Sequence, residues 1–171
     1  MDGVTVVLRL LHVLGGVMWV GAVLVTVLFI FKVTADMGPS GAQVMNGLVK
    51  HRFLDVIPAA ALVTVLSGID LLRRVSSGFD PAWMGSRMGI TLSIGALAAI
   101  LGLVVGVGVA RPTTLKTLAL GREIAGLPDG PDKASRMAAL GALRARGQGA
   151  LRVAAVLLVI ATAAMAIARY M

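Results

Sequence analysis

The chain has 171 residues, of which 58% are hydrophobic and 14% are charged, and its formal net charge is +8. Soluble domains have an apolar share of about 45–50%, so this composition excludes an ordinary soluble domain and indicates an integral membrane protein. The sequence contains no cysteine, which excludes disulfides, thiolate metal ligands and cysteine nucleophiles.

Four apolar segments follow one another along the chain, at about 4–31, 53–72, 88–110 and 150–168. Each is close to the roughly 20 residues that a helix needs to cross a bilayer. The first segment lacks a basic leader and is longer than the apolar part of a signal peptide, so we expect it to stay as a helix. The predicted fold is all-α: one membrane domain, 1–171, built as an antiparallel four-helix bundle.

Two of the connecting segments carry helical patterns of their own. In the segment 32–52, residues 43–50 are amphipathic and are expected to lie at the membrane interface. Pro112 should bend or restart the third helix, after which leucines at helical spacing continue as far as a Gly- and Pro-rich cluster at 126–131. A further helix then leads into the fourth span, which predicts a helical hairpin over 113–148, outside the membrane.

The basic residues are distributed unevenly between the two sides of the predicted bundle. Eleven of the sixteen lie in or beside the segments 32–52 and 111–149. They are Lys32, Lys50, Arg52, Arg111, Lys116, Arg122, Lys133, Arg136, Arg144, Arg146 and Arg152. The positive-inside rule therefore places these segments in the cytoplasm and both termini outside the cell's inner (plasma) membrane. Anionic lipid headgroups are the expected partners of this charge, and no base-reading features indicate nucleic acid.

Acidic residues at the ends of the second span are expected to form ion pairs. Asp70 should reach the same outer level as Arg9 in an antiparallel pair of helices, and Asp55 lies near the inner face. Carboxylates at these positions need neutralising partners. The candidate partners of Asp55 are Lys32, Arg52 and Arg152.

His12 is the strongest functional candidate, because ionisable side chains inside a membrane span are costly and seldom idle. It lies eight residues past Val4, or about 12 Å inside the outer boundary. Gly15 and Gly16 leave the helix face beside it without side chains, so a flat macrocycle can approach the imidazole. Imidazole is a common axial ligand of haem iron. The alternatives are a buried, hydrogen-bonded histidine and glycines that bring two helices into close contact.

A second iron ligand has few candidates. The other histidine, His51, is expected at the opposite interface, which excludes a bis-histidine site within one chain. Met165 or Met88 would approach the outer half of the bundle, and five-coordinate haem or a site completed by a second subunit remain alternatives. Trp19 lies on the His12 face near mid-span, where it either walls a pocket or packs between helices.

Two further patterns concern partners and metals. Gly85/Gly89 and Gly102/Gly106 have GxxxG spacing, which favours close helix packing within the chain, in a homo-oligomer or with other membrane subunits. The nine methionines are soft ligands suited to copper, but they are scattered rather than clustered.

Residues 8–21 read LRLLHVLGGVMWVG. A first helix with Leu-x-x-Leu-His, a glycine pair and Trp-x-Gly resembles the copper-resistance protein D group, the HemJ-type protoporphyrinogen oxidases and related integral membrane proteins, and is most similar to the uncharacterised branch of these. The resemblance implies haem b bound by His12. The chain departs from the HemJ-type pattern because its later spans contain no lysine and no second deep histidine.

Three functions agree with these observations. The first is a haem-b-binding redox protein, with His12 as axial ligand and with Gly15, Gly16 and Trp19 shaping the pocket. The second is a non-catalytic accessory subunit of a larger membrane complex. The third is copper handling. No catalytic triad, phosphate-binding loop or paired-carboxylate site points to a hydrolase or a kinase.

Overall fold

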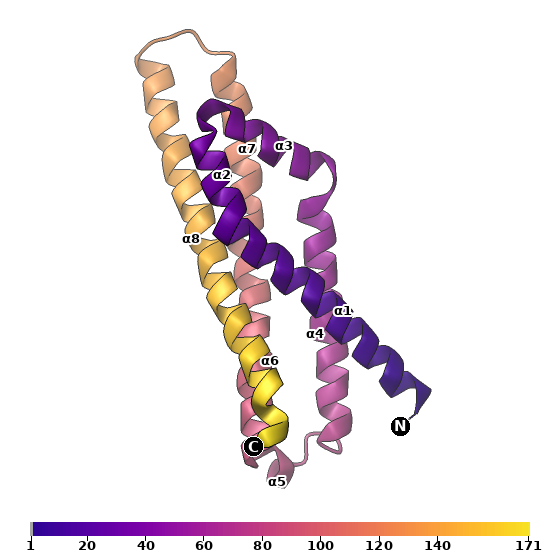
Figure 1. Ribbon diagram of the computed structural model, residues 1–171. Coiled ribbons are helices and arrows are strands. Elements are labelled where there is room, and N and C mark those ends of the chain that lie inside the picture. The colour runs from indigo at the N-terminus through magenta and orange to yellow at the C-terminus, as the bar shows by residue number, and fades with distance from the viewer. Residues whose placement is uncertain (1) are drawn as a thin grey trace.

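The computed structural model describes residues 2–171, and over this range it contains helices and turns but no strand. Four helical segments in this range are long and apolar enough to cross a membrane: Gly3–Asp36, Phe53–Val75, Arg87–Ala125 and Pro131–Tyr170. They alternate in direction, and the first segment crosses the other three obliquely (Figure 1). The prediction of an all-α, four-helix membrane bundle is confirmed.

The first segment is longer than its apolar core. It consists of α1 (Gly3–Val25), the π-helical turn η1 (Thr26–Ile30) and α2 (Phe31–Asp36). Asp2 begins it as a capping residue, since its carboxylate accepts a hydrogen bond of 2.9 Å from the Thr5 amide. Because α2 continues to Asp36, the chain stays helical beyond the end of the apolar run at residue 31.

A short helical corner leads from the first segment to the second. The 3₁₀ turn η2 (Gly38–Ser40) is followed by α3 (Gly41–Lys50), which folds back against α2 and leads to α4 (Phe53–Val75). A Cβ at Gly41 would lie 2.1 Å from the Thr34 carbonyl oxygen, so only glycine permits this contact. The amphipathic segment is a helix, as predicted.

The third segment runs straight past the predicted bend. It is preceded by α5 (Pro81–Met84), and it comprises α6 (Arg87–Val105), the π-helical turn η3 (Gly106–Ala110) and α7 (Arg111–Ala125). Pro112 has no N–H for the carbonyl four residues earlier, and the π-helical turn just before it accommodates this loss without a break. The helix therefore continues out of the bundle as the first arm of the hairpin.

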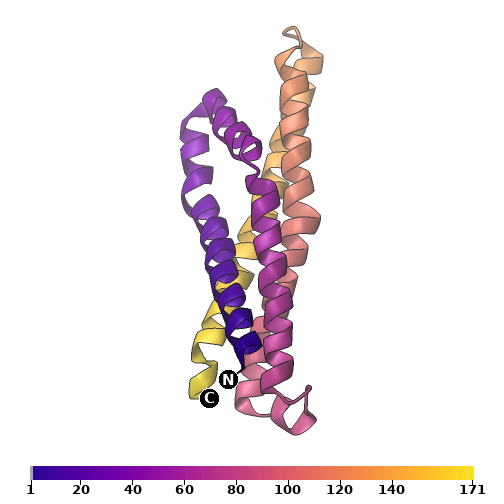
Figure 2. The same cartoon turned by 90° about the vertical axis from the view of Figure 1, so that its right-hand side faces the viewer.

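The fourth segment supplies the second arm. Helix α8 (Pro131–Ile167) has 37 residues and ends in the 3₁₀ turn η4 (Ala168–Tyr170). At 1.5 Å per residue it is about 55 Å long, well beyond the roughly 30 Å of a bilayer core. Figures 1 and 2 show α7 and α8 paired and projecting beyond α2 and α3, at the end opposite to both termini. The predicted hairpin extension is confirmed.

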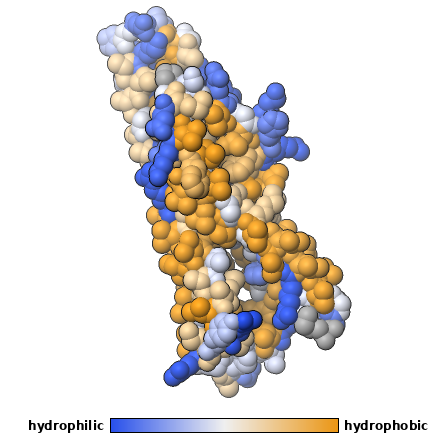
Figure 3. All heavy atoms as spheres, viewed as in Figure 1, coloured by the Kyte–Doolittle hydropathy of each residue, from blue (hydrophilic) through white to orange (hydrophobic). Residues whose placement is uncertain are grey.

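The bundle is made of two close pairs, α1 with α4 and α6 with α8. Their shared core is rich in alanine: Trp19, Val23, Ala61, Ala98, Ala99, Ala155, Leu158 and Ala161. Many aliphatic side chains instead face outward, and they cover the middle of the molecule in Figure 3. A bilayer explains this surface, because lipid replaces water around the bundle.

Some of the glycines with GxxxG spacing lie against neighbouring atoms of the same chain. A Cβ at Gly89 would lie 2.3 Å from the Trp83 carbonyl oxygen, and one at Gly102 would lie 3.4 Å from the Leu158 side chain. A Cβ at Gly85 would lie 3.3 Å from the Pro81 carbonyl oxygen, whereas one at Gly106 would meet nothing within 4 Å in the part of the chain that the structure describes. Three of these four glycines thus lie against neighbours within the chain.

Candidate functional site

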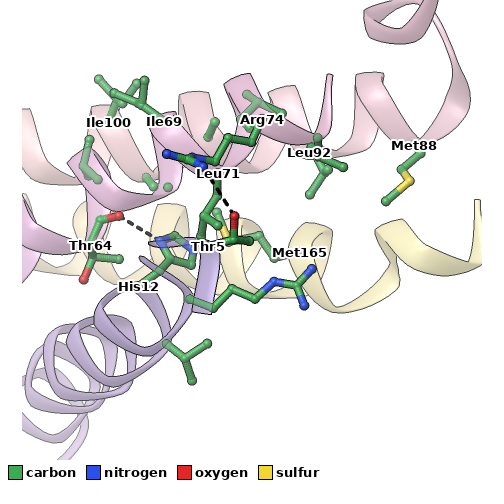
Figure 4. A pocket seen from close by; sticks show the side chains of 18 residues that line it. Thr5, His12, Thr64, Ile69, Leu71, Arg74, Met88, Leu92, Ile100 and Met165 are labelled. Carbon is green, nitrogen blue, oxygen red and sulfur yellow. Dashed lines mark hydrogen bonds between the residues drawn. The ribbon is translucent and has the colours of Figure 1, made fainter. Parts of the chain in front are cut away.

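The imidazole of His12 lies between α1 and α4 and is held by a backbone carbonyl. Its Nδ1 is 2.8 Å from the Thr64 carbonyl oxygen, as the dashed line in Figure 4 shows. A carbonyl only accepts hydrogen bonds, so Nδ1 carries the proton and donates it. In the neutral ring Nε2 then keeps its lone pair and is the nitrogen available to bind a metal or accept a proton.

Gly68 lies against the edge of this ring formed by Cε1 and Nδ1. A Cβ at Gly68 would lie 2.7 Å from Cε1 and 2.9 Å from Nδ1 of His12, closer than any ordinary contact. Gly68 follows Thr64 by one helical turn, so the two residues form a cradle on α4 for the imidazole. Sequence analysis missed both residues, although their small-xxx-small spacing in an apolar span is a signal for close helix contact.

Gly15 and Gly16 lie against α4. A Cβ at Gly15 would lie 2.6 Å from Thr64 Oγ1, and one at Gly16 would lie 3.6 Å from Thr64 Cγ2. The Thr64 side chain therefore occupies the space that side chains at Gly15 and Gly16 would take. The glycine pair contributes to the site by letting α1 approach α4 closely enough for His12 to reach the Thr64 carbonyl.

A cavity of about 570 Å³ opens beside His12, among α1, α4, α6 and α8. Its walls are mostly aliphatic, and Figure 4 shows the side chains that line it. Met88 from α6 and Met165 from α8 border the same cavity as His12. The histidine and both methionines that the sequence suggested as iron ligands thus line one cavity, with Met88 at the end away from His12 (Figure 4).

Trp19 lies elsewhere. Its side chain is only 5% exposed and belongs to the alanine-rich core, two helical turns beyond His12 and outside the cavity lining. His51 ends α3 and is exposed. The structure therefore separates Trp19 and His51 from the cavity.

Charged groups gather at the end of the cavity that lies nearest the N-terminus. Arg9 and Arg74 are part of its lining. Arg74 donates from Nε to Asp70 at 2.9 Å and from Nη1 to Asp2 at 3.1 Å. Asp70 also accepts from Arg73 at 2.7 Å. The carboxylate of Asp70 is thus neutralised by arginines three and four residues further along its own helix.

Asp2 precedes the first candidate membrane span and caps the start of α1. Hydrogen bonds from Thr5 hold the pKa of Asp2 below its usual value, and the charge of Arg74 lowers that pKa further. Asp2 is therefore an anion at neutral pH and ties the start of α1 to the end of α4.

At the other end of α4, Asp55 has a partner that the sequence did not suggest. Its carboxylate accepts a 2.8 Å bond from Arg111, rather than from Lys32, Arg52 or Arg152. Arg111 Nε also donates to the Leu54 carbonyl at 2.9 Å. Pro58, four residues after Leu54, has no N–H for that carbonyl, so Arg111 satisfies an acceptor that the proline leaves open.

The residues 2–171 contain no group of three or more His, Cys, Asp or Glu side chains that would hold a metal ion. A metal at His12 would therefore need soft ligands such as methionine, or a prosthetic group that brings its own donors. Comparisons with known protein families, with curated proteins and with solved structures found no match to this chain.

Proposed function

We propose that this small multi-pass membrane protein binds haem b in the cavity beside His12, with His12 Nε2 as the axial ligand. The hydrogen bond from His12 Nδ1 to the Thr64 carbonyl carries the proposal. Metal-bound histidines almost always donate their second ring N–H to a carbonyl, a carboxylate or water, which fixes the tautomer and raises the basicity of the ligating nitrogen. Here that arrangement is built in by the contact of α1 with α4.

The size and lining of the cavity also support a haem. Its volume of about 570 Å³ lies within the roughly 300–1,000 Å³ typical of cofactor sites. A porphyrin supplies four nitrogen donors, so the protein has to provide only one or two ligands. His12 is the first, and Met165 or Met88 is the candidate for the second.

Bound haem would supply one-electron chemistry that these side chains lack. His12 would hold the iron, and a methionine as a second ligand would favour electron transfer by raising the reduction potential. Without the methionine, an open iron position would suit an oxidase. The resemblance of residues 8–21 to the copper-resistance protein D group and the HemJ-type proteins points to the same cofactor.

The orientation in the membrane belongs to this proposal. The basic hairpin and the corner formed by α2 and α3 would face the cytoplasm, in contact with anionic headgroups. Both termini and the charged end of the cavity would then lie at the outer face of the plasma membrane.

Copper handling is the second candidate, because His12, Met88 and Met165 all border one cavity. An imidazole with thioethers is a donor set that suits Cu(I). It would leave the protein colourless in the reduced state, whereas haem gives a strong Soret band.

The deciding experiment is absorption spectroscopy of protein purified in mild detergent after haem-replete expression. We expect a Soret band that sharpens with dithionite, persists in His51→Ala and is lost in His12→Ala. His51 is the matched control, since it is exposed at the end of α3. A colourless wild type, or a band that survives His12→Ala, would overturn the haem assignment. Copper bound to a colourless wild type and lost in His12→Ala would support the second candidate.

A further inference from the structure

A second apolar space lies between α4 and α6, nearer to the hairpin than the cavity beside His12. This α4–α6 groove has a volume of about 530 Å³ and is open to the surface of the bundle. Its walls include Pro58, Ala59 and Leu62 from α4, and Leu103, Val107 and Gly108 from α6 and η3. The bilayer core holds no water to fill such a groove, so an acyl chain of the surrounding lipid is its natural occupant.

The α4–α6 groove runs through one leaflet of the membrane. Pro58 and Leu62 follow the start of α4 at Phe53 by five and nine residues. At 1.5 Å per residue they lie about 8 and 14 Å along the helix. Half of a bilayer core is about 15 Å thick. The groove therefore extends from near the boundary of the core to near its middle, in the leaflet beside the hairpin.

Arg52 stands at the boundary end of this groove. It is the residue that begins α4, and it precedes Ala59 by seven residues. Residues seven apart lie on the same face of a helix, so Arg52 is in line with the groove and about 10 Å beyond Ala59. Arg52 is exposed, and within residues 2–171 its guanidinium has no hydrogen bond or ion pair. This position suits the phosphate of a lipid whose acyl chain occupies the groove.

The charges at this end of the groove favour an anionic headgroup. Asp55 lies on the same face of α4, but Arg111 neutralises its carboxylate through a 2.8 Å contact. The segment 32–55 and Arg111 together carry four cations against two carboxylates. The cations are Lys32, Lys50, Arg52 and Arg111, and the carboxylates are Asp36 and Asp55. The excess of two positive charges attracts anionic lipid more strongly than neutral lipid.

We propose that the α4–α6 groove binds one anionic phospholipid from the leaflet beside the hairpin, with an acyl chain against Pro58 and Gly108 and the phosphate at Arg52. This inference goes beyond the proposed function, because it involves a separate site and needs no haem. It also differs from general contact between the basic hairpin and headgroups, since it assigns one lipid to one groove. The lipid is then part of the interface between the two close helix pairs.

The test is native mass spectrometry of the detergent-purified chain, titrated with phosphatidylglycerol or with phosphatidylcholine of the same acyl chains. We expect the wild type to retain one phosphatidylglycerol per chain. Phosphatidylcholine has no net charge and should bind about five-fold more weakly, the difference expected for one basic residue at an anionic surface.

Arg52→Asn removes the charge without straining the corner. Arg52 has a φ of 60°, and asparagine adopts this left-handed backbone more readily than arginine. We expect Arg52→Asn to lose the preference for phosphatidylglycerol and Arg52→Lys to keep it. Arg122→Gln is the matched control, because Arg122 is also exposed and without an ion pair in the described part of the chain. It lies eleven residues beyond Arg111 on α7 and should keep the preference.

A second pair of variants tests the groove itself. A Cβ at Gly108 would meet nothing within 4 Å among the described residues, so Gly108→Leu can place its side chain in the groove. We expect Gly108→Leu to lose both lipids. Gly121→Leu is the matched control, since a Cβ at Gly121 is equally free and Gly121 does not line the groove. It should bind both lipids as the wild type does.

Several results would overturn the inference. They are equal affinity of the wild type for the two lipids, equal losses in Arg52→Asn and Arg122→Gln, and lipid binding that Gly108→Leu leaves unchanged. A lipid-free dimer of the wild type that Gly108→Leu dissociates would also overturn it, because a second copy of the chain would then occupy the groove.

Discussion

Replacing Gly68 with alanine tests whether the close approach of α4 to the His12 ring holds the site together. An added Cβ would lie 2.7 Å from Cε1 of His12, whereas ordinary contacts begin at 3.4 Å, so the ring has to retreat by about 0.7 Å. The same movement stretches the 2.8 Å hydrogen bond to the Thr64 carbonyl toward its limit. The ring therefore loses its orientation.

The expected cost combines three contributions. Overpacking costs about 1–3 kcal/mol, and a weakened hydrogen bond costs about 0.5–1.5 kcal/mol. Alanine returns about 1 kcal/mol through its higher helix propensity. We therefore expect Gly68→Ala to lower the free energy of unfolding by about 0.5–3.5 kcal/mol.

The assay is denaturant unfolding in detergent, followed by circular dichroism. Gly21→Ala is the matched control, because nothing lies within 4 Å of its Cβ position among the described residues. We expect Gly21→Ala to be neutral or stabilising by up to about 1 kcal/mol. If Gly68→Ala and Gly21→Ala change the free energy of unfolding equally, the close contact of Gly68 with the His12 ring does not confine that ring.

Two further outcomes concern the end of the bundle near the hairpin and the orientation of the chain in the membrane. Arg111→Gln should lower the unfolding free energy by about 1–3 kcal/mol, because the Leu54 carbonyl loses its donor. Asp55→Asn should cost less, since it removes only an exposed ion pair, and equal losses in the same unfolding assay would contradict this reasoning. For the orientation, the absence of native cysteines allows labelling of single-cysteine variants. Ser77→Cys should react with an impermeant maleimide in intact cells and Asp129→Cys only after lysis, and the reverse pattern would contradict cytoplasmic placement of the hairpin.

The number and order of the helices could be predicted from the sequence for a simple reason. Apolar runs of about 20 residues and the breaker cluster at 126–131 are local signals that need no knowledge of neighbours. The candidate site was harder to predict from the sequence, because it depends on the rotation of each helix about its axis. Hydropathy identified His12 as exceptional, but it does not show that His12 faces Thr64, which lies 52 residues away.

The partner of Asp55 shows what a closer physical reading would add. Pro58 inside an apolar span leaves the carbonyl of Leu54 without its helical donor. That open acceptor predicts a donor from another helix, and Arg111 provides it. A helix broken at Pro112 would not align Arg111 with the start of α4. The π-helical turn η3 removes the bend.

The two arms of the hairpin differ in stiffness. Helix α8 runs from the tip of the hairpin to the cavity without a proline or a π-helical turn after its first turn. Helices α6 and α7, by contrast, meet at η3, where the hydrogen-bond ladder changes register. A tilt of the tip would therefore be transmitted along the uninterrupted helix α8 to Met165, whereas in the other arm the change of register at η3 is the position where bending is expected. Such a tilt would move the Met165 thioether relative to His12.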